Sequence, residues 1–445
     1  MKGTLLNLIP IKYNRDGLAA RWVALKMLEA ILYDKIMLID LKVAKNFPFS
    51  QLSPEQKARS LSLLENVLRN LSQIDLTVQR YVKKPPKPKV LNILRLAISE
   101  LILDKLPDYA AVNTSVELAK LDNRTKNQSG LINAVCRKVS LNPSFSSPEN
   151  HLHLLDPFMT KLRSTYGEEI ASKIAKSHQA IPPLDLNFKD TQTLDQLSDL
   201  IKGRVLPLGT LRLDNKTNLS KLPGYDEGLW WVQDFASSLP IKLLSSLRNK
   251  KVLDVCAAPG GKTMQLCAAG AQVYAIDISK RRIENLKANL ARTNLKAQII
   301  VGDIFEYKTE EKFDIVVLDA PCSATGTMRR NFDLRFLNPL DRVEKLKRNQ
   351  KKMLIRCMDF IKDDGSILYC NCSLFPDEGE DIVKETLEVV SGWVIKPIKL
   401  KGLSLDSSWS GKKGDLRLRP DYWKEIGGMD GFYASLLSKQ KRSVD

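Results

Sequence analysis

The feature that most constrains the fold is an alternation of short β-branched runs and helical stretches between residues 251 and 390. The runs that predict strands are Val252–Val255, Gln272–Ile278, Gln298–Val301, Asp314–Leu318 and Ser366–Tyr369. The stretches that predict helices are Lys262–Ala269, Lys280–Arg292, Val343–Ile361 and Gly379–Val390. Such alternation is typical of a doubly wound α/β domain with a largely parallel sheet, in which ligands bind beyond the carboxyl ends of the strands.

The rest of the chain has a different pattern. Residues 15–141 show helical periodicity, with apolar stripes such as Trp22, Leu25, Leu28, Ile31, Leu32 and Leu61, Leu64, Val67, Leu68, Leu71. The lysine–proline run 83–89 must be a connector, because proline cannot continue a helix. We predict an all-helical domain over 1–141, a linker over 142–150, a small α+β module over 151–240 and the α/β domain over 241–445.

The charge of the 445-residue chain favours a polyanionic partner. The net charge is +18, and residues 1–150 hold 23 Lys+Arg against 13 Asp+Glu, a net of +10. Nucleic acid is the commonest such partner, although a solvated basic surface is the alternative.

The sequence also bears on where the protein is found. The first ten residues do not resemble a secretory signal, no apolar run is long enough for a bilayer, and the seven cysteines are irregularly spaced. We expect a cytoplasmic protein without membrane segments or a disulfide framework.

The loop after the first predicted strand, Asp254–Thr263, combines small residues with two glycines, which lets a ligand approach the backbone. A P-loop needs glycine where Cys256 stands, and the dinucleotide pattern G-x-G-x-x-G is absent. Asp277 and Asp303 follow the next two strands, where carboxylates grip ribose hydroxyls or an adenine edge. This set suits a nucleoside without phosphates, such as S-adenosylmethionine; the alternative is that both aspartates only cap turns.

Two cysteines follow the next two strands. Cys322 lies in Asp319-Ala320-Pro321-Cys322-Ser323, and Cys372 in Tyr369-Cys370-Asn371-Cys372-Ser373. A cysteine at such a place is often only a small buried apolar group. We expect no metal, because no C-x-x-C pair occurs and the histidines, His151, His153 and His178, all lie outside the α/β domain. The same absence argues against a Cys–His hydrolase.

These motifs together resemble the RsmB (Sun, Fmu) group of ribosomal RNA cytosine-5 methyltransferases, over roughly residues 15–440. The resemblance extends to Trp231–Ser237 before the domain, to Arg329-Arg330, and to Gly428–Tyr433 near the end. Residues 95–97, 110–113 and 131–135 look like the NusB-like helical domain that precedes it. The resemblance implies a Rossmann-like methyltransferase domain and an enzyme that modifies one cytosine of 16S ribosomal RNA. We expect a monomer.

Site residues follow from the resemblance. It implies that the cofactor is held by Cys256, Ala257, Ala258, Pro259, Gly260, Gly261, Lys262, Asp277, Asp303 and Asp319. Cys372 would be the nucleophile that adds to carbon 6 of cytosine, and Cys322 would help to release the product. Asp319 would hydrogen-bond the base, while Lys262 would hold Asp319 and favour the thiolate of Cys372.

The chain departs from the family pattern at three places. Asn371 stands where the family usually has threonine, and 331–336 replaces His-Pro-Asp-Ile-(Arg/Lys)-Trp, a loop expected close to the substrate. Cys370 is a rival to Cys372 as the nucleophile, because alternate residues of a strand share a face.

Other functions are alternatives to this one. An exocyclic-amine methyltransferase would show Asn/Asp-Pro-Pro-aromatic after the fourth strand, where this chain has Asp-Ala-Pro-Cys. The same chemistry on transfer RNA and a non-catalytic RNA-binding or antitermination factor stay open.

Overall fold

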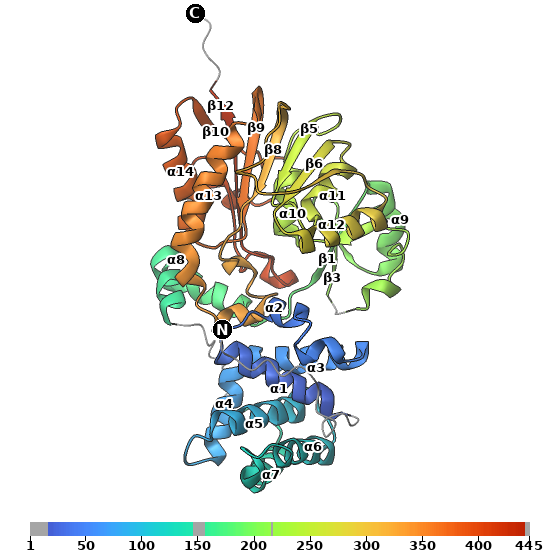
Figure 1. The fold of residues 1–445 in the computed structure, drawn as a ribbon, viewed down its shortest axis with the longest axis vertical. Coiled ribbons are helices and arrows are strands. Elements are labelled where there is room, and N and C mark those ends of the chain that lie inside the picture. Colours follow the sequence, from blue (N-terminus) through green and yellow to red (C-terminus); the bar gives the residue numbers. More distant parts are fainter. Residues whose placement is uncertain (1–16, 146–155, 215–216, 441–445) are drawn as a thin grey trace, which may run out of the picture. The chain divides into compact units, whose positions relative to one another are not determined.

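The structure, a computed structural model, describes residues 17–145, 156–214 and 217–440 (Figure 1). Contacts divide the chain into two compact units, one formed by 1–159 with 331–338 and the other by 160–330 with 339–445. Most of the predicted linker, from residue 146 to 150, lies outside the described residues. No helix of the described ranges is both long and apolar enough to cross a membrane.

The first unit is helical throughout its described residues. Its α-helices are α1 (Leu18–Leu32), α2 (Leu38–Val43), α3 (Pro54–Arg69), α4 (Leu71–Tyr81), α5 (Pro88–Ile102), α6 (Asp108–Lys120) and α7 (Ser129–Ser140). Ser53 and Gln56 form a reciprocal capping box that starts α3. The prediction that the lysine–proline run connects two helices is confirmed, because α4 ends at Tyr81 and α5 begins at Pro88.

The predicted apolar stripes form the core of this unit. Trp22, Leu25 and Leu28 of α1 are buried against Leu64 and Leu68 of α3 in one cluster. Leu32 and Leu61, at the edges of the stripes, are only partly buried. An amphipathic helix gains most of its stability by burying its apolar face. The apolar stripe therefore decides how these helices pack, more than the helix propensity of their residues does.

Residues 331–338 belong to this helical unit, although they come from the middle of the α/β domain in sequence. Phe332 and Phe336 of the short 3₁₀ helix 332–336 are buried in the core that α1 and α3 form. Leu38 N donates to Asp333 Oδ2 at 2.8 Å, and Lys35 Nζ donates to the Phe336 carbonyl at 2.9 Å. The segment thus packs into the helical core, and the expectation that it lies close to the substrate stays a prediction.

The second unit begins with α8 (Asp156–Ser177), which crosses the boundary between the units, and a four-stranded antiparallel sheet in the order β2-β3-β1-β4. The strands are β1 (Leu184–Phe188), β2 (Arg204–Leu206), β3 (Thr210–Leu213) and β4 (Trp230–Val232), and α9 (Thr191–Ile201) packs on them. A buried ion pair joins Arg212 to Asp185 at 2.7 Å, and Arg212 Nη1 donates to the carbonyl of Gly428 at 2.7 Å. This small sheet is thereby tied to the end of the larger domain.

The larger sheet has the order β10-β12-β9-β8-β5-β6-β7, with β11 paired to β12. Its strands are β5 (Lys251–Val255), β6 (Gln272–Asp277), β7 (Gln298–Val301), β8 (Phe313–Asp319), β9 (Ile361–Asn371), β10 (Trp393–Lys396), β11 (Leu416–Leu418) and β12 (Phe432–Lys439). The pairs β5–β6, β5–β8, β6–β7 and β8–β9 are parallel. The predicted doubly wound sheet is confirmed, with antiparallel strands added at one edge.

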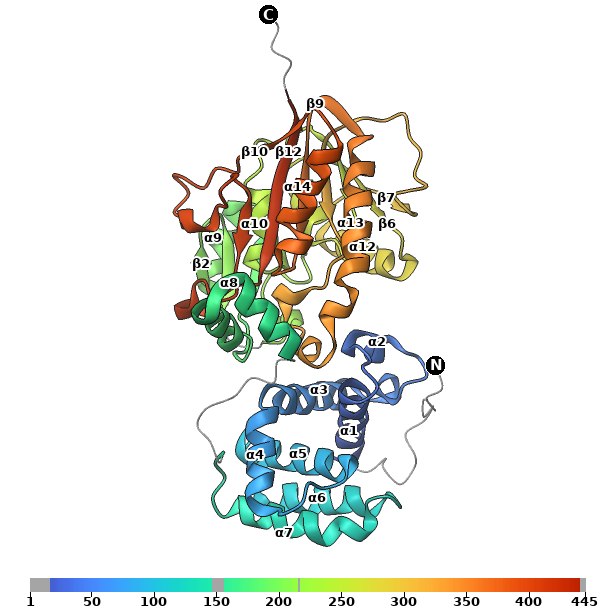
Figure 2. The ribbon, with the colours of Figure 1, turned by 90° about the vertical axis from the view of Figure 1, so that its left-hand side faces the viewer.

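Helices cover both faces of this sheet (Figures 1 and 2). On one face lie α10 (Phe235–Lys242), α11 (Gly261–Ala268) and α12 (Lys280–Thr293). On the other lie α13 (Val343–Met358) and α14 (Glu380–Val389), which run side by side in Figure 2. Because β5 is flanked by β6 and β8, the chain reverses its direction of winding at β5. A ligand crevice is expected at that point.

Candidate active site

The loop between β5 and α11 forms one wall of a cavity of about 370 Å³, within the ordinary range for small-molecule sites. Of the predicted residues, Cys256, Ala257, Ala258, Pro259, Gly261, Lys262, Asp319 and Cys372 line it. Gly260 does not line the cavity. It has a φ of 110°, and a side chain there would collide with Leu286 of α12, so Gly260 brings the loop against that helix.

Asp254, the carboxylate of β5, also faces this cavity and was not among the predicted site residues. Thr263 Oγ1 donates to Asp254 Oδ2 at 2.6 Å, whereas Oδ1 is buried without a hydrogen-bond partner among the described residues. Burial raises the pKa of Asp254 to about 7, against the opposing effects of Thr263 and Lys262. A buried acceptor without a partner is rare. A cationic ligand group, such as the ammonium of S-adenosylmethionine, fits it.

Asp277 and Asp303 occupy the predicted strand ends but do not line the cavity. Asp277 Oδ2 accepts from Ala258 N at 3.2 Å and pairs with Arg282, and its Oδ1 accepts from Ser279 N at 2.9 Å. Asp303 Oδ1 accepts from Phe305 N at 3.0 Å. In this structure both carboxylates hold loop backbone, and a direct contact of either one with the cofactor stays a prediction.

Lys262 and Asp319 form an ion pair inside the cavity. Their side chains come from α11 and from the end of β8, and Lys262 Nζ lies 2.8 Å from Asp319 Oδ2. Lys262 is 7% exposed and Asp319 37%, so the carboxylate is the partner that reaches toward the open space. Burial opposes the charge of Lys262, but Asp319 outweighs it and raises the pKa of Lys262. The lysine therefore stays charged and orients the carboxylate.

The structure brings the two predicted cysteines together. Cys322 follows β8 and Cys372 follows β9, and these neighbouring strands are parallel, with Asp319 opposite Cys370. The carboxyl ends of both strands thus meet at one edge of the sheet. The Sγ atoms of Cys322 and Cys372 lie 3.4 Å apart. Cys372 lines the cavity, whereas Cys322 does not.

The resting form of Cys372 is the thiol. Its hydrogen bond with Cys322 and its burial raise the pKa of Cys372 well above the ordinary value. Lys262 acts in the expected direction, toward the thiolate, but is outweighed. Cys370 is fully buried within β9, its Sγ is 3.8 Å from Asp319 Oδ1, and it does not line the cavity. Its position therefore disfavours Cys370 as the nucleophile.

Two buried polar side chains hold the turns that carry the cysteines. Asn371 Oδ1 accepts from Ser373 N at 2.9 Å, and its Nδ2 donates to the Glu378 carbonyl at 2.6 Å. Asn371, which stands where the family usually has threonine, thus makes a hydrogen bond to the backbone two residues ahead, as asparagine often does in turns. Glu378 accepts from Ser323 N at 2.9 Å, although the two residues are 55 positions apart. No local pattern signals that role of Glu378, which explains why it was not predicted.

A cluster of two arginines and two aspartates adjoins the cavity, which Asp234, Arg330 and Asp430 line. Arg329 Nη2 and Arg330 Nη2 lie 2.8 and 2.5 Å from Asp234 Oδ2. The same arginines reach Asp430 through their Nε atoms, at 2.6 and 3.0 Å. Burial alone would raise the pKa of Asp234, but the two arginines hold it well below its usual range. All four side chains come from segments that the resemblance had singled out.

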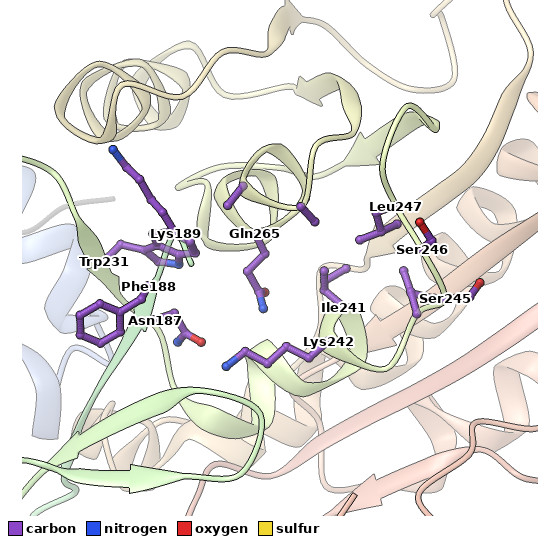
Figure 3. A pocket seen from close by; sticks show the side chains of 13 residues that line it. Asn187, Phe188, Lys189, Trp231, Ile241, Lys242, Ser245, Ser246, Leu247 and Gln265 are labelled. Atoms are coloured by element: carbon purple, nitrogen blue, oxygen red, sulfur yellow. The ribbon is translucent and has the colours of Figure 1, made fainter. Parts of the chain in front are cut away.

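A second cavity, of about 260 Å³, lies away from these residues (Figure 3). Lys242 of α10 extends past Gln265 toward Asn187 of β1, and its Nζ donates to Thr210 Oγ1 at 2.6 Å. Burial lowers the pKa of Lys242 to about 8, because the nearby charge of Asp185 compensates only in part. None of the predicted site residues lines this cavity. It is separate from the candidate active site.

A doubly wound domain with a cavity at the switch point and two cysteines in contact beside it is an S-adenosylmethionine-dependent RNA cytosine-5 methyltransferase. Residues 241–438 match the family described as 16S rRNA methyltransferase RsmB/F, and residues 18–141 match the NusB family. The chain belongs to the RsmB/F family and carries a NusB-family region ahead of the catalytic domain.

Relatives match over most of the chain. Ribosomal RNA small subunit methyltransferase B of Vibrio cholerae is 30% identical, with 88% of this chain and 91% of that protein covered. The protein of the same name from Shewanella oneidensis is 29% identical, with 87% and 92% covered. The crystal structure of PH0851 has the same fold, with a TM-score of 0.71, 21% identity and coverage of 94% of this chain and 98% of that one.

Proposed function

We propose that the protein methylates carbon 5 of one cytosine in 16S ribosomal RNA through a covalent bond between Cys372 and the base. The observation that carries the proposal is the 3.4 Å contact between the sulfurs of Cys372 and Cys322 at the wall of the cavity. The ribosomal substrate is supported by the relatives, which are named as small-subunit ribosomal RNA methyltransferases.

Carbon 5 of cytosine is too weak a nucleophile to attack a methyl sulfonium unaided. When Cys372 gives up its proton and its sulfur adds to carbon 6, the ring becomes an enamine with electron density at carbon 5. Asp319, held by Lys262, hydrogen-bonds the base and stabilises charge as the adduct forms. Bound S-adenosylmethionine supplies the methyl group that carbon 5 accepts. The cysteine adduct thus divides one difficult step into easier ones.

Product release requires the reverse bond change at carbon 6. Removal of the carbon 5 proton returns an electron pair to the ring and breaks the bond to Cys372. Cys322 is in contact with the departing sulfur, so we assign it to this step. The raised pKa of Cys372 implies that its thiolate forms when the substrate binds, because the resting site favours the thiol.

The cofactor would occupy the cavity beside the loop 256–262. The loop backbone would approach its adenosine part, and Asp254 Oδ1 would accept from its ammonium. We keep Asp277 and Asp303 in the proposed cofactor site. Asp277 would act there by fixing the loop 256–262, since its carboxylate accepts a hydrogen bond from Ala258 N. The target cytosine must leave its stack to reach Cys372, at a cost of roughly a few kcal/mol.

The two cysteines should fail differently when replaced. Cys322→Ala should still attack and methylate but release slowly, so a protein–RNA adduct should survive denaturing electrophoresis. Cys372→Ala should form no adduct, and adding it to Cys322→Ala should abolish the trapped species. Cys370→Ala is the matched control, because its sulfur is buried outside the cavity. An adduct that requires Cys322 and persists in Cys372→Ala would reverse the two roles.

The RNA target needs a separate measurement. Bisulfite sequencing of total RNA from a deletion strain, complemented with the parent or with Cys372→Ala, should show one 16S cytosine methylated only with the parent. A change confined to transfer RNA would keep the chemistry and refute the ribosomal substrate. No change in any RNA, with no adduct formed, would leave the chain as a non-catalytic RNA-binding protein.

A further inference from the structure

Helix α13 carries two kinds of cationic side chain. Lys347 and Lys351 both pair with Glu385 of α14, at 2.8 and 3.3 Å. The hydrogen bond to Glu385 is the main cause that raises the pKa of Lys347, and Glu344 contributes in the same direction. These lysines serve the packing of α13 against α14.

The second kind lies on another face of the same helix. Lys345, Arg348 and Lys352 are spaced by three and four residues, so they project from one side of an α-helix. All three are exposed, and no carboxylate of the described chain lies within ion-pair distance of them. With Arg342, Leu346 and Asn349 they line a groove of about 640 Å³ that contains no acidic residue. We call Lys345, Arg348 and Lys352 the cationic face of α13.

Helix stability does not explain this face. Like charges three and four residues apart weaken a helix slightly, and none of these three cations forms an ion pair with a carboxylate of the described residues. Seven residues of α-helix rise about 10.5 Å, and one strand of a duplex presents one phosphate charge per about 3.4 Å of the axis. A strand lying along the groove would therefore offer about three phosphates to these three cations. Phosphate binding gives the exposed charges a partner that the fold does not provide.

The helix is also fixed to the loop of Cys322. Gln350 is buried on the inward side of α13, and its Nε2 donates to the Pro321 carbonyl at 2.8 Å and to Glu378 Oε1 at 3.1 Å. Glu378 in turn holds Ser323, so the residues on both sides of Cys322 are bound to the same network. Phosphates bound on the cationic face would thus lie at a constant distance from the two cysteines.

We propose that the cationic face of α13 binds phosphates of the RNA substrate and positions the strand that carries the target cytosine. The proposal rests on the proposed function for the identity of the RNA. It predicts a role for this face in RNA affinity and none in the affinity for the cofactor. The paired lysines on the same helix provide a control with equal charge.

The experiment compares Lys345→Gln/Arg348→Gln with Lys347→Gln/Lys351→Gln, each of which lowers the net charge by two. Binding of an unmodified 16S ribosomal RNA transcript is measured by fluorescence anisotropy from 50 to 300 mM salt. The first pair should weaken binding at least fivefold at low salt and reduce the slope of log Kd against log salt by about 1–2. The control pair should change Kd less than twofold. Cofactor affinity and the melting temperature should match the parent in the first pair.

Equal losses in both pairs would overturn the proposal, because net charge alone would then explain the binding. An unchanged salt slope in the first pair would overturn it as well. Adduct formation with the same transcript is scored separately. If Cys322→Ala forms no adduct but the two pairs still differ in salt slope, the proposed covalent methylation fails while the RNA-binding face stands.

Discussion

Asp254 shows how burial can prepare one residue for a ligand. Its carboxyl has one oxygen bonded to Thr263 and the other without a partner, in a cavity that also holds Lys262 and Asp319. The stretch 254–263 singles out the loop, but local pattern does not reveal which of its polar atoms lacks a partner. That depends on how α11 packs over β5. The structure therefore adds a residue to the predicted cofactor site.

We predict that cofactor affinity depends on pH through Asp254. Because burial raises its pKa to about 7, the carboxyl is increasingly protonated below that pH in the free protein. An ammonium requires the ionised form, so binding releases a proton and affinity falls as pH falls. Calorimetry should find S-adenosylmethionine bound about eightfold more weakly at pH 6 than at pH 7.5.

Asp254→Asn should remove that dependence and weaken binding at pH 7.5 about tenfold, as expected for a lost charged hydrogen bond. Asp364→Asn is the control, because this carboxylate is exposed and does not line the cavity. A parent protein whose affinity is flat from pH 6 to pH 7.5 would contradict the assignment of Asp254.

At the scale of elements, the α/β alternation could be read from the sequence within a few residues, because strand and helix periodicities differ strongly. The exception is the end of α13, at Met358, since Ile361 already begins β9. The antiparallel strands β10 and β11 are short and lacked a clear pattern. The packing of 331–338 could not be predicted, because its partners in α1 and α3 lie some 300 residues away.

Phe336 gives a test of that packing. Replacing it with alanine should remove a buried aromatic side chain from the helical core and lower stability by about 3–5 kcal/mol. Hydrogen exchange followed by mass spectrometry should show lost protection in α1 and α3. Tyr109→Ala, at a residue that is 73% exposed, should change little. Unchanged exchange in α1 and α3 of the Phe336 variant would show that the segment does not contribute to the core.

At the scale of the whole molecule, the region with the excess positive charge and the helical unit of the fold do not cover the same residues. Residues 1–150 hold a net charge of +10, yet the helical unit also includes residues 331–338. Removing residues 1–141 alone would expose Phe332 and Phe336, which are normally buried. A truncation meant to test RNA binding should therefore also replace both phenylalanines with serine.

We predict that this truncated double variant binds the 16S transcript at least tenfold more weakly than the full chain at 100 mM salt. The reason is that the lost segment carries more than half of the net charge of +18. Its salt slope should be shallower by several units in an anisotropy titration. The full-length double variant controls for the serines. Equal affinities with and without the segment would show that the helical domain does not bind the RNA.

The contact between Cys322 and Cys372 also has a consequence for oxidation. A disulfide needs its sulfurs about 2.05 Å apart, and here they are 3.4 Å apart before any movement. Peroxide can take one electron pair from the two thiols, joining the sulfurs as two waters form, and a Cys372 in a disulfide can no longer form the thiolate that would attack a base. Brief peroxide treatment should therefore abolish methyl transfer to the RNA, lower the mass of the protein by two hydrogens, and be reversed by dithiothreitol. Loss of activity without that change in mass would contradict this. If the proposed division of catalysis between two sulfurs holds, methylation by this protein depends on a reducing environment.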